Sequence, residues 1–116
     1  MIIRDIGDSQ LAPDYGVLFQ QIYPIGGEDL ADWGVGRCVI EAGGQTAPHG
    51  HDEHEMFLVL EGAGEMDIDG ERAALTAGQA VAIPAGSRHY LRNASDQARL
   101  VFINVYWPPS VSPLDI

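Results

Sequence analysis

The sequence predicts an all-β fold, a small barrel or jelly roll, in a single domain over residues 1–116. Fourteen Gly and seven Pro separate short apolar runs, as they do in folds with many strands and tight turns. No segment shows a persuasive 3.6-residue apolar period. With 46% hydrophobic residues the chain can bury a core. We expect this core over about residues 15–107 and an extended tail over 108–116.

The first half of the chain predicts strands at 17–23, 34–40 and 55–60. The second of these ends before the Gly43-Gly44 turn, and the third is apolar after its first residue. Because both faces of the run at 55–60 are apolar, we expect both to be covered, and a homodimer is the simplest cover for the outer face. We expect Ile2-Ile3 to form an edge strand, and in a dimer we expect this segment to cross to the partner sheet.

The second half alternates strands with clear turn signals. Gly64, Met66 and Ile68 alternate with acidic residues, which predicts a strand with one solvent-exposed face. Asp69-Gly70 is a two-residue hairpin signal, so 71–75 is the expected return strand. Shorter strands are predicted at 80–83, ending at Pro84, and at 89–93. The last strand, 100–107, is ended by the prolines at 108 and 109.

Charge and composition exclude several function classes. The net charge is −11 and every basic residue is Arg, so the chain would repel a nucleic-acid backbone. The absence of Lys excludes a lysine Schiff base and with it protein-anchored pyridoxal phosphate chemistry, and no glycine-loop nucleotide motif is present. The single cysteine, Cys38, excludes an intrachain disulfide. The chain has neither a signal-peptide pattern nor an apolar run long enough for a membrane span, so we expect a cytoplasmic protein.

Four side chains in two short segments are candidate metal ligands. His49, His51 and Glu55 lie within seven residues, and His89 follows the turn at Pro84. The first three are odd-numbered, so on an extended chain they share one face, whereas His54 should point away. Three imidazoles and one carboxylate suit one divalent ion, with Zn or Fe(II) favoured and Mn, Ni, Co or Cu as alternatives.

The spacings around these residues resemble both motifs of the cupin superfamily. Gly43, His49, His51, Glu55 and Gly62 match G(X)5HXH(X)3–4E(X)6G, and Gly78, Pro84, Gly86, His89 and Asn93 match G(X)5PXG(X)2H(X)3N. Gln79 stands where the second motif often has Asp. The resemblance implies a small single-domain cupin with a jelly-roll barrel, also called a double-stranded β-helix, and commonly a homodimer. It also implies that His49, His51, Glu55 and His89 are the metal ligands.

The resemblance does not supply a reaction, because cupins host many chemistries. We expect a metal-dependent enzyme acting on a small molecule in secondary or peripheral metabolism. Two alternatives stay open: a ligand-binding or sensor module without turnover, and a zinc cupin that works with a synthetase-like partner in N–N bond (hydrazine) formation. The candidate catalytic residues are Arg37, Glu53 and Tyr106. Arg37 lies in mid-strand, where its charge must reach either solvent or the cavity.

Overall fold

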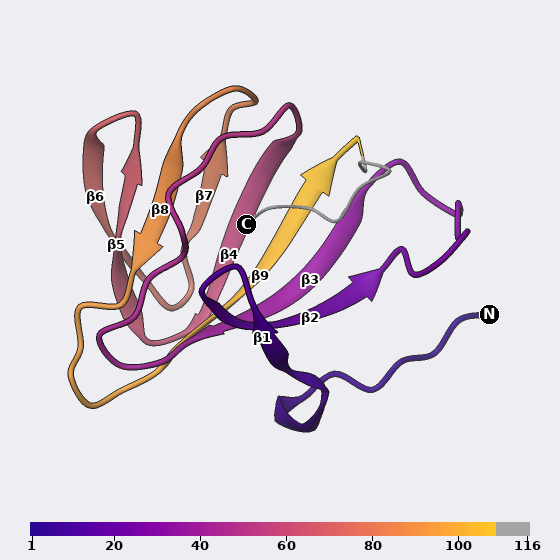
Figure 1. Ribbon diagram of the computed structural model, residues 1–116, viewed down its shortest axis with the longest axis horizontal. Coiled ribbons are helices and arrows are strands. Elements are labelled where there is room, and N and C mark those ends of the chain that lie inside the picture. Colours follow the sequence, from indigo (N-terminus) through magenta and orange to yellow (C-terminus); the bar gives the residue numbers. More distant parts are fainter. Residues whose placement is uncertain (109–116) are drawn as a thin grey trace.

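The structure, a computed structural model, describes residues 1–108 and is built almost entirely from strands (Figure 1). In chain order its elements are the 3-10 segment η1 (Asp8–Gln10) and strands β1 (Ala12–Asp14), β2 (Val17–Tyr23), β3 (Gly34–Ile40), β4 (His54–Glu61), β5 (Ala63–Ile68), β6 (Glu71–Thr76), β7 (Ala80–Ile83), β8 (His89–Arg92) and β9 (Leu100–Trp107). The all-β prediction is confirmed. Within these residues, no helix has the length and apolarity needed to cross a membrane.

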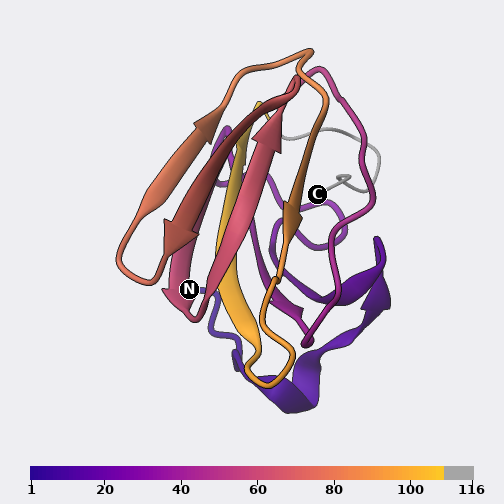
Figure 2. The same ribbon diagram turned by 90° about the vertical axis from the view of Figure 1, so that its left-hand side faces the viewer.

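The strands form two antiparallel sheets. The larger sheet has the order β1-β2-β3-β9-β4-β7, and the smaller has the order β6-β5-β8. Figure 2 looks onto the side of the molecule that carries β5, β6, β7 and β8. The chain crosses from the larger sheet to the smaller one after β4 and back after β6, so segments far apart in sequence become neighbours.

Most of the predicted strands are confirmed within one or two residues of their ends. The hairpin between β5 and β6 is also confirmed: Asp69 and Gly70 both have positive φ, of 52° and 88°, and Ile68 pairs with Glu71. Strand β1 was not predicted. It pairs with β2 after a turn in which Tyr15 and Gly16 both have positive φ.

Residues 1–7 join no sheet of this chain, so Ile2-Ile3 forms no edge strand within it, and its crossing to a partner stays a prediction. Side-chain contacts hold this segment instead: Arg4 donates to the Ile22 carbonyl oxygen at 2.9 Å, and Gln20 donates to that of Asp5 at 2.8 Å. The extended tail was expected over 108–116, and its residues from 109 onward lie outside the described part of the chain.

The core lies between the two sheets and is apolar at one end. Phe57 on β4 and Phe102 on β9 are fully buried, with ring centroids 4.4 Å apart. Met66 and Leu91 close the core from the smaller sheet, and Cys38 lies in it as a buried free thiol. The inward face of β9 runs from Leu100 and Phe102 to Asn104 and Tyr106, so it becomes polar along the strand. The candidate site lies at that polar end.

Candidate metal centre

Backbone pairing brings the two histidine segments together. His49 and His89 form an isolated antiparallel bridge. The His89 amide donates to the His49 carbonyl oxygen at 2.9 Å, and the His49 amide donates to the His89 carbonyl oxygen at 3.2 Å. The Gly86 amide donates to the His51 carbonyl at 2.8 Å. The loop before β4 is therefore tied to the turn before β8, although nearly forty residues separate them.

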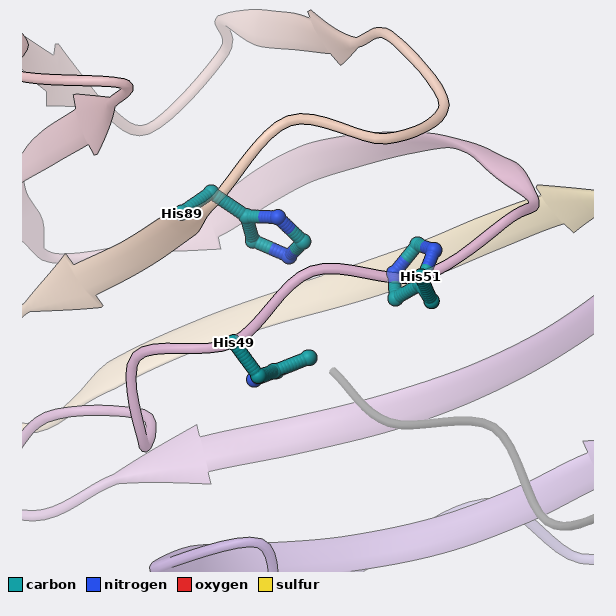
Figure 3. A group of neighbouring side chains, drawn as sticks. All are labelled: His49, His51 and His89. Atoms are coloured by element: carbon teal, nitrogen blue, oxygen red, sulfur yellow. The ribbon is translucent and has the colours of Figure 1, made fainter.

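The three imidazole rings form a compact group (Figure 3). His49 and His51 project from the loop that leads into β4, and His89 projects from the start of β8. Their ring centroids are 5.6 Å (49–51), 4.9 Å (49–89) and 5.2 Å (51–89) apart. One potential ligand atom from each ring lies within 4.8 Å of the others. This spacing allows three imidazole nitrogens to share one ion.

Glu55, the second residue of β4, lies beside two of the three imidazoles. Its side chain is fully buried, and its Oε1 lies 3.1 Å from His51 Nε2 and 3.3 Å from His89 Nε2. Burial raises the pKa of the Glu55 carboxyl, but contacts with His51, His89 and Asn104 outweigh it and lower the pKa overall. Burial lowers the pKa of His51, and the Glu55 and Glu53 carboxylates more than reverse this effect. Glu55 is therefore held as a carboxylate.

Each imidazole has a backbone carbonyl near its Nδ1 atom. The Ala47 carbonyl oxygen lies 2.5 Å from His49 Nδ1, and the Glu53 carbonyl oxygen lies 3.0 Å from His51 Nδ1. The Ser87 carbonyl oxygen lies 3.5 Å from His89 Nδ1, which is a weaker contact. Because a carbonyl oxygen only accepts, these contacts favour a proton on Nδ1, and in His49 and His89 they leave the Nε2 atom free to accept or to bind a metal ion.

The donor set fits a divalent metal ion. Nε2 of His49 and of His89 are buried and have no hydrogen-bond partner among the described residues. The 3.3 Å approach of His89 Nε2 to Glu55 is close enough for charge attraction but lacks hydrogen-bond geometry. Buried polar atoms without partners are costly, and a cation among them would remove that cost. Neutral imidazoles with one carboxylate are ligands that first-row divalent ions accept.

His54 points away from this group, as the strand parity predicted. It is exposed, its Nδ1 accepts a hydrogen bond of 3.1 Å from the Ala85 amide, and its ring lies 5.9 Å from that of Trp107. Its neighbour in sequence, Glu55, is fully buried, as alternation along β4 requires.

The three candidate catalytic residues have different positions. Arg37 follows the outward register of β3 and donates to Asp8 at 3.0 Å, so it does not face the imidazoles. Glu53 contacts His51 Nδ1 through its carboxylate at 3.3 Å, which helps to orient that ring. Tyr106 lies beside Glu55 in the ladder, is almost fully buried and accepts a hydrogen bond of 2.8 Å from Gln21. Burial raises the pKa of its phenol.

Sequence reasoning missed Asn104, which contacts the group directly. Its Nδ2 donates to Glu55 Oε2 at 3.0 Å, and its side chain is fully buried. A signal was present in the sequence. Asn104 is the one amide in the otherwise apolar and aromatic run 100–107, and it has the same parity as Tyr106.

Fold and donor set together define a small β-barrel protein with a candidate metal centre of three histidines, two of which lie beside the Glu55 carboxylate. The family model "Cupin domain" matches residues 36–106, which is more than half of the chain. The chain therefore belongs to the cupin family.

Solved structures support the same assignment. A Cupin 2 conserved barrel domain protein from Salinispora arenicola is 31% identical, with a TM-score of 0.80 over 92% of this chain and 88% of that one. The plu4264 protein from Photorhabdus luminescens matches in fold, with a TM-score of 0.82 over the same shares and 24% identity.

Curated relatives match over shorter stretches. "Polyketide synthase CurC" from Streptomyces cyaneus is 40% identical over 70 residues, which are 59% of this chain and 46% of that protein. "Quercetin 2,3-dioxygenase" from Bacillus subtilis is 48% identical over 50 residues, which are 43% of this chain and 15% of that enzyme. The chain thus spans half or less of the length of these relatives.

Proposed function

We propose that this protein is a metal-dependent enzyme that acts on a small molecule, with His49, His51, Glu55 and His89 as ligands. The observation that carries the proposal is the group of three imidazoles beside the buried Glu55 carboxylate, because Nε2 of His49 and of His89 are buried there without hydrogen-bond partners among the described residues. A divalent ion held there would supply a Lewis acid, or a site for dioxygen if it is iron, because four protein ligands leave coordination positions open.

The names of the relatives favour an oxygen-rich aromatic or polyketide-type substrate. One relative is named for polyketide synthesis and another for the oxygenation of quercetin, a phenol with several hydroxyl groups. Such a molecule can offer a hydroxyl or carbonyl oxygen to a Lewis acid. This substrate class agrees with a role in secondary metabolism.

Tyr106 and Glu53 have distinct roles in this proposal. The Gln21 amide nitrogen can only donate, so the Tyr106 oxygen is the acceptor in their bond and its own proton stays available. With its raised pKa the phenol remains protonated and can donate to a substrate oxygen. Glu53 holds the ring of His51.

Metal analysis combined with a turnover assay tests this function. Protein purified without added metal should carry close to one equivalent of a first-row ion. Removing it with a chelator should abolish turnover of quercetin or of a phenolic polyketide, and adding the ion back should restore it. Tyr106→Phe should retain the metal but turn over more slowly, by roughly 10²–10⁴-fold if the phenol acts as a general acid. Full activity of the metal-free protein would overturn the proposal, and metal binding without turnover of such substrates would favour the sensor alternative.

We also propose that a second copy of the chain covers the outer face of the larger sheet. Leu58 and Leu60 on β4 are 36% and 57% exposed. Val35, Val105 and Trp107 of the same sheet, together with Asp32 and Trp33 from the loop before β3, line an open hollow of about 670 Å³. Exposed apolar side chains gathered on one face in this way are typical of an association surface.

Light scattering during gel filtration checks the dimer. The wild-type protein should elute at twice the chain mass of 12.5 kDa. Leu58→Glu should shift it to the monomer mass, because a charge would be buried in the contact. Ala73→Glu, at an exposed position on β6 of the other sheet, should leave the dimer intact. A monomeric wild-type protein would exclude this assembly.

A further inference from the structure

The two carboxylate oxygens of Glu55 have different partners, and Asn104 on β9 is the partner of one of them. Its Nδ2 donates to Glu55 Oε2 at 3.0 Å, while Oε1 lies 3.1 Å and 3.3 Å from Nε2 of His51 and His89. One carboxylate oxygen therefore faces the imidazoles and the other faces an amide. All of these atoms are buried or nearly so.

The amide has little freedom to leave this position. In the ladder, Asn104 lies between Gly36 on β3 and Phe57 on β4. A Cβ atom at Gly36 would lie 2.6 Å from Asn104 Oδ1 and 2.6 Å from Phe19 Cε1. The absent side chain of Gly36 thus makes room for the amide, and the neighbours hold it in place.

Packing alone does not account for an amide at this position. Asn104 Oδ1 is buried and has no hydrogen-bond partner among the described residues. An unpaired buried carbonyl is unfavourable, and an apolar side chain of similar size would avoid it. An asparagine at this position can donate a hydrogen bond to Glu55, whereas a leucine could not.

We infer that Asn104 is a positioning residue that presents only Oε1 of Glu55 to the metal. The inference rests on the proposed metal centre and identifies a further residue that shapes it. Rotation of a carboxylate about its last side-chain bond is soft, so a bond to one oxygen selects the orientation. Groups that orient ligands in this way typically contribute 10- to 100-fold to metal affinity.

A cobalt titration of the metal-free protein tests the inference, with absorption and a competing chelator as readouts. Asn104→Leu should bind Co²⁺ about 10- to 100-fold more weakly than the wild-type protein. The visible bands of its cobalt complex should also shift, because the released carboxylate can offer both oxygens. Asn104→Ser, whose side chain is too short to reach Oε2, should behave in the same way and serves if the leucine variant does not fold.

The control is Phe102→Leu, which lies two residues earlier on the same buried face and does not touch the carboxylate. It should lower the unfolding temperature of the metal-free protein but leave the cobalt affinity and spectrum unchanged. Wild-type affinity and spectrum in the folded Asn104 variants would overturn the inference and leave the metal centre standing. A wild-type protein that binds no cobalt would overturn the proposed metal centre and the inference together.

Discussion

Replacing His49 and His51 together with alanine is expected to abolish metal binding, so that metal content falls from about one equivalent to none. The variant loses two of four donor atoms, and Glu55 with His89 alone provides too few ligands to retain an ion through purification. The fold should survive, because both histidines lie on the loop before β4 and neither belongs to the apolar core. Elemental analysis measures the metal, and circular dichroism checks the fold.

His54→Ala provides the matched control in the same stretch of chain. His54 is exposed and bonds to the Ala85 amide rather than facing the other imidazoles. This variant should retain the wild-type metal content and turnover. If the double variant still bound one equivalent of metal while His54→Ala bound none, the proposed ligand set would be wrong.

Gly62→Ala is expected to cause the largest loss of stability among the glycine substitutions in the two motifs. Gly62 has φ of +85°, and a Cβ atom there would lie 2.4 Å from the Arg99 carbonyl oxygen. The left-handed backbone alone costs alanine about 1–2 kcal/mol. The clash with backbone atoms, which cannot rotate away as a side chain does, adds roughly 1–3 kcal/mol.

Gly78→Ala separates these two contributions. Gly78 has a similar φ of +90°, but a Cβ atom there would meet nothing within 4 Å. Its substitution should therefore show only the backbone cost. Urea unfolding followed by tryptophan fluorescence gives the free energy of unfolding for both variants. Equal losses in the two variants would mean that the chain around Arg99 relaxes and that crowding has no role at Gly62.

Local sequence pattern was sufficient for most of the secondary structure. Gly and Pro end the strands where the chain must turn. Alternation on β5 was only partly right, because Met66 is buried as predicted but Asp67, on the face predicted to be solvent-exposed, is buried as well. The Asp69-Gly70 turn was predicted because few residues other than Gly, Asn and Asp tolerate positive φ at both central positions. Parity also separated His54 from Glu55, because alternation along a strand is a local property.

Other features depend on contacts between distant segments. Ile2-Ile3 forms no strand within the chain, because an apolar pair in the sequence does not show whether a sheet edge is free. The turn at Tyr15-Gly16 instead makes β1 the partner of β2. Arg37 could face either way on sequence grounds, and its outward position follows from the register of β3 with β9.

Part of the candidate site was likewise predictable from the sequence, and part depends on contacts between distant segments. Parity within one segment grouped His49, His51 and Glu55, and the resemblance of the flanking spacings to the cupin motifs added His89 to the expected ligands. Only the tertiary structure brought His89 against His49, through a bridge between segments that sequence distance keeps apart. It also revealed Asn104, whose role depends on β9 pairing with β4 in one register. A strand's own sequence specifies its two faces, but the residue that lies opposite each position is decided by the packing of the whole barrel.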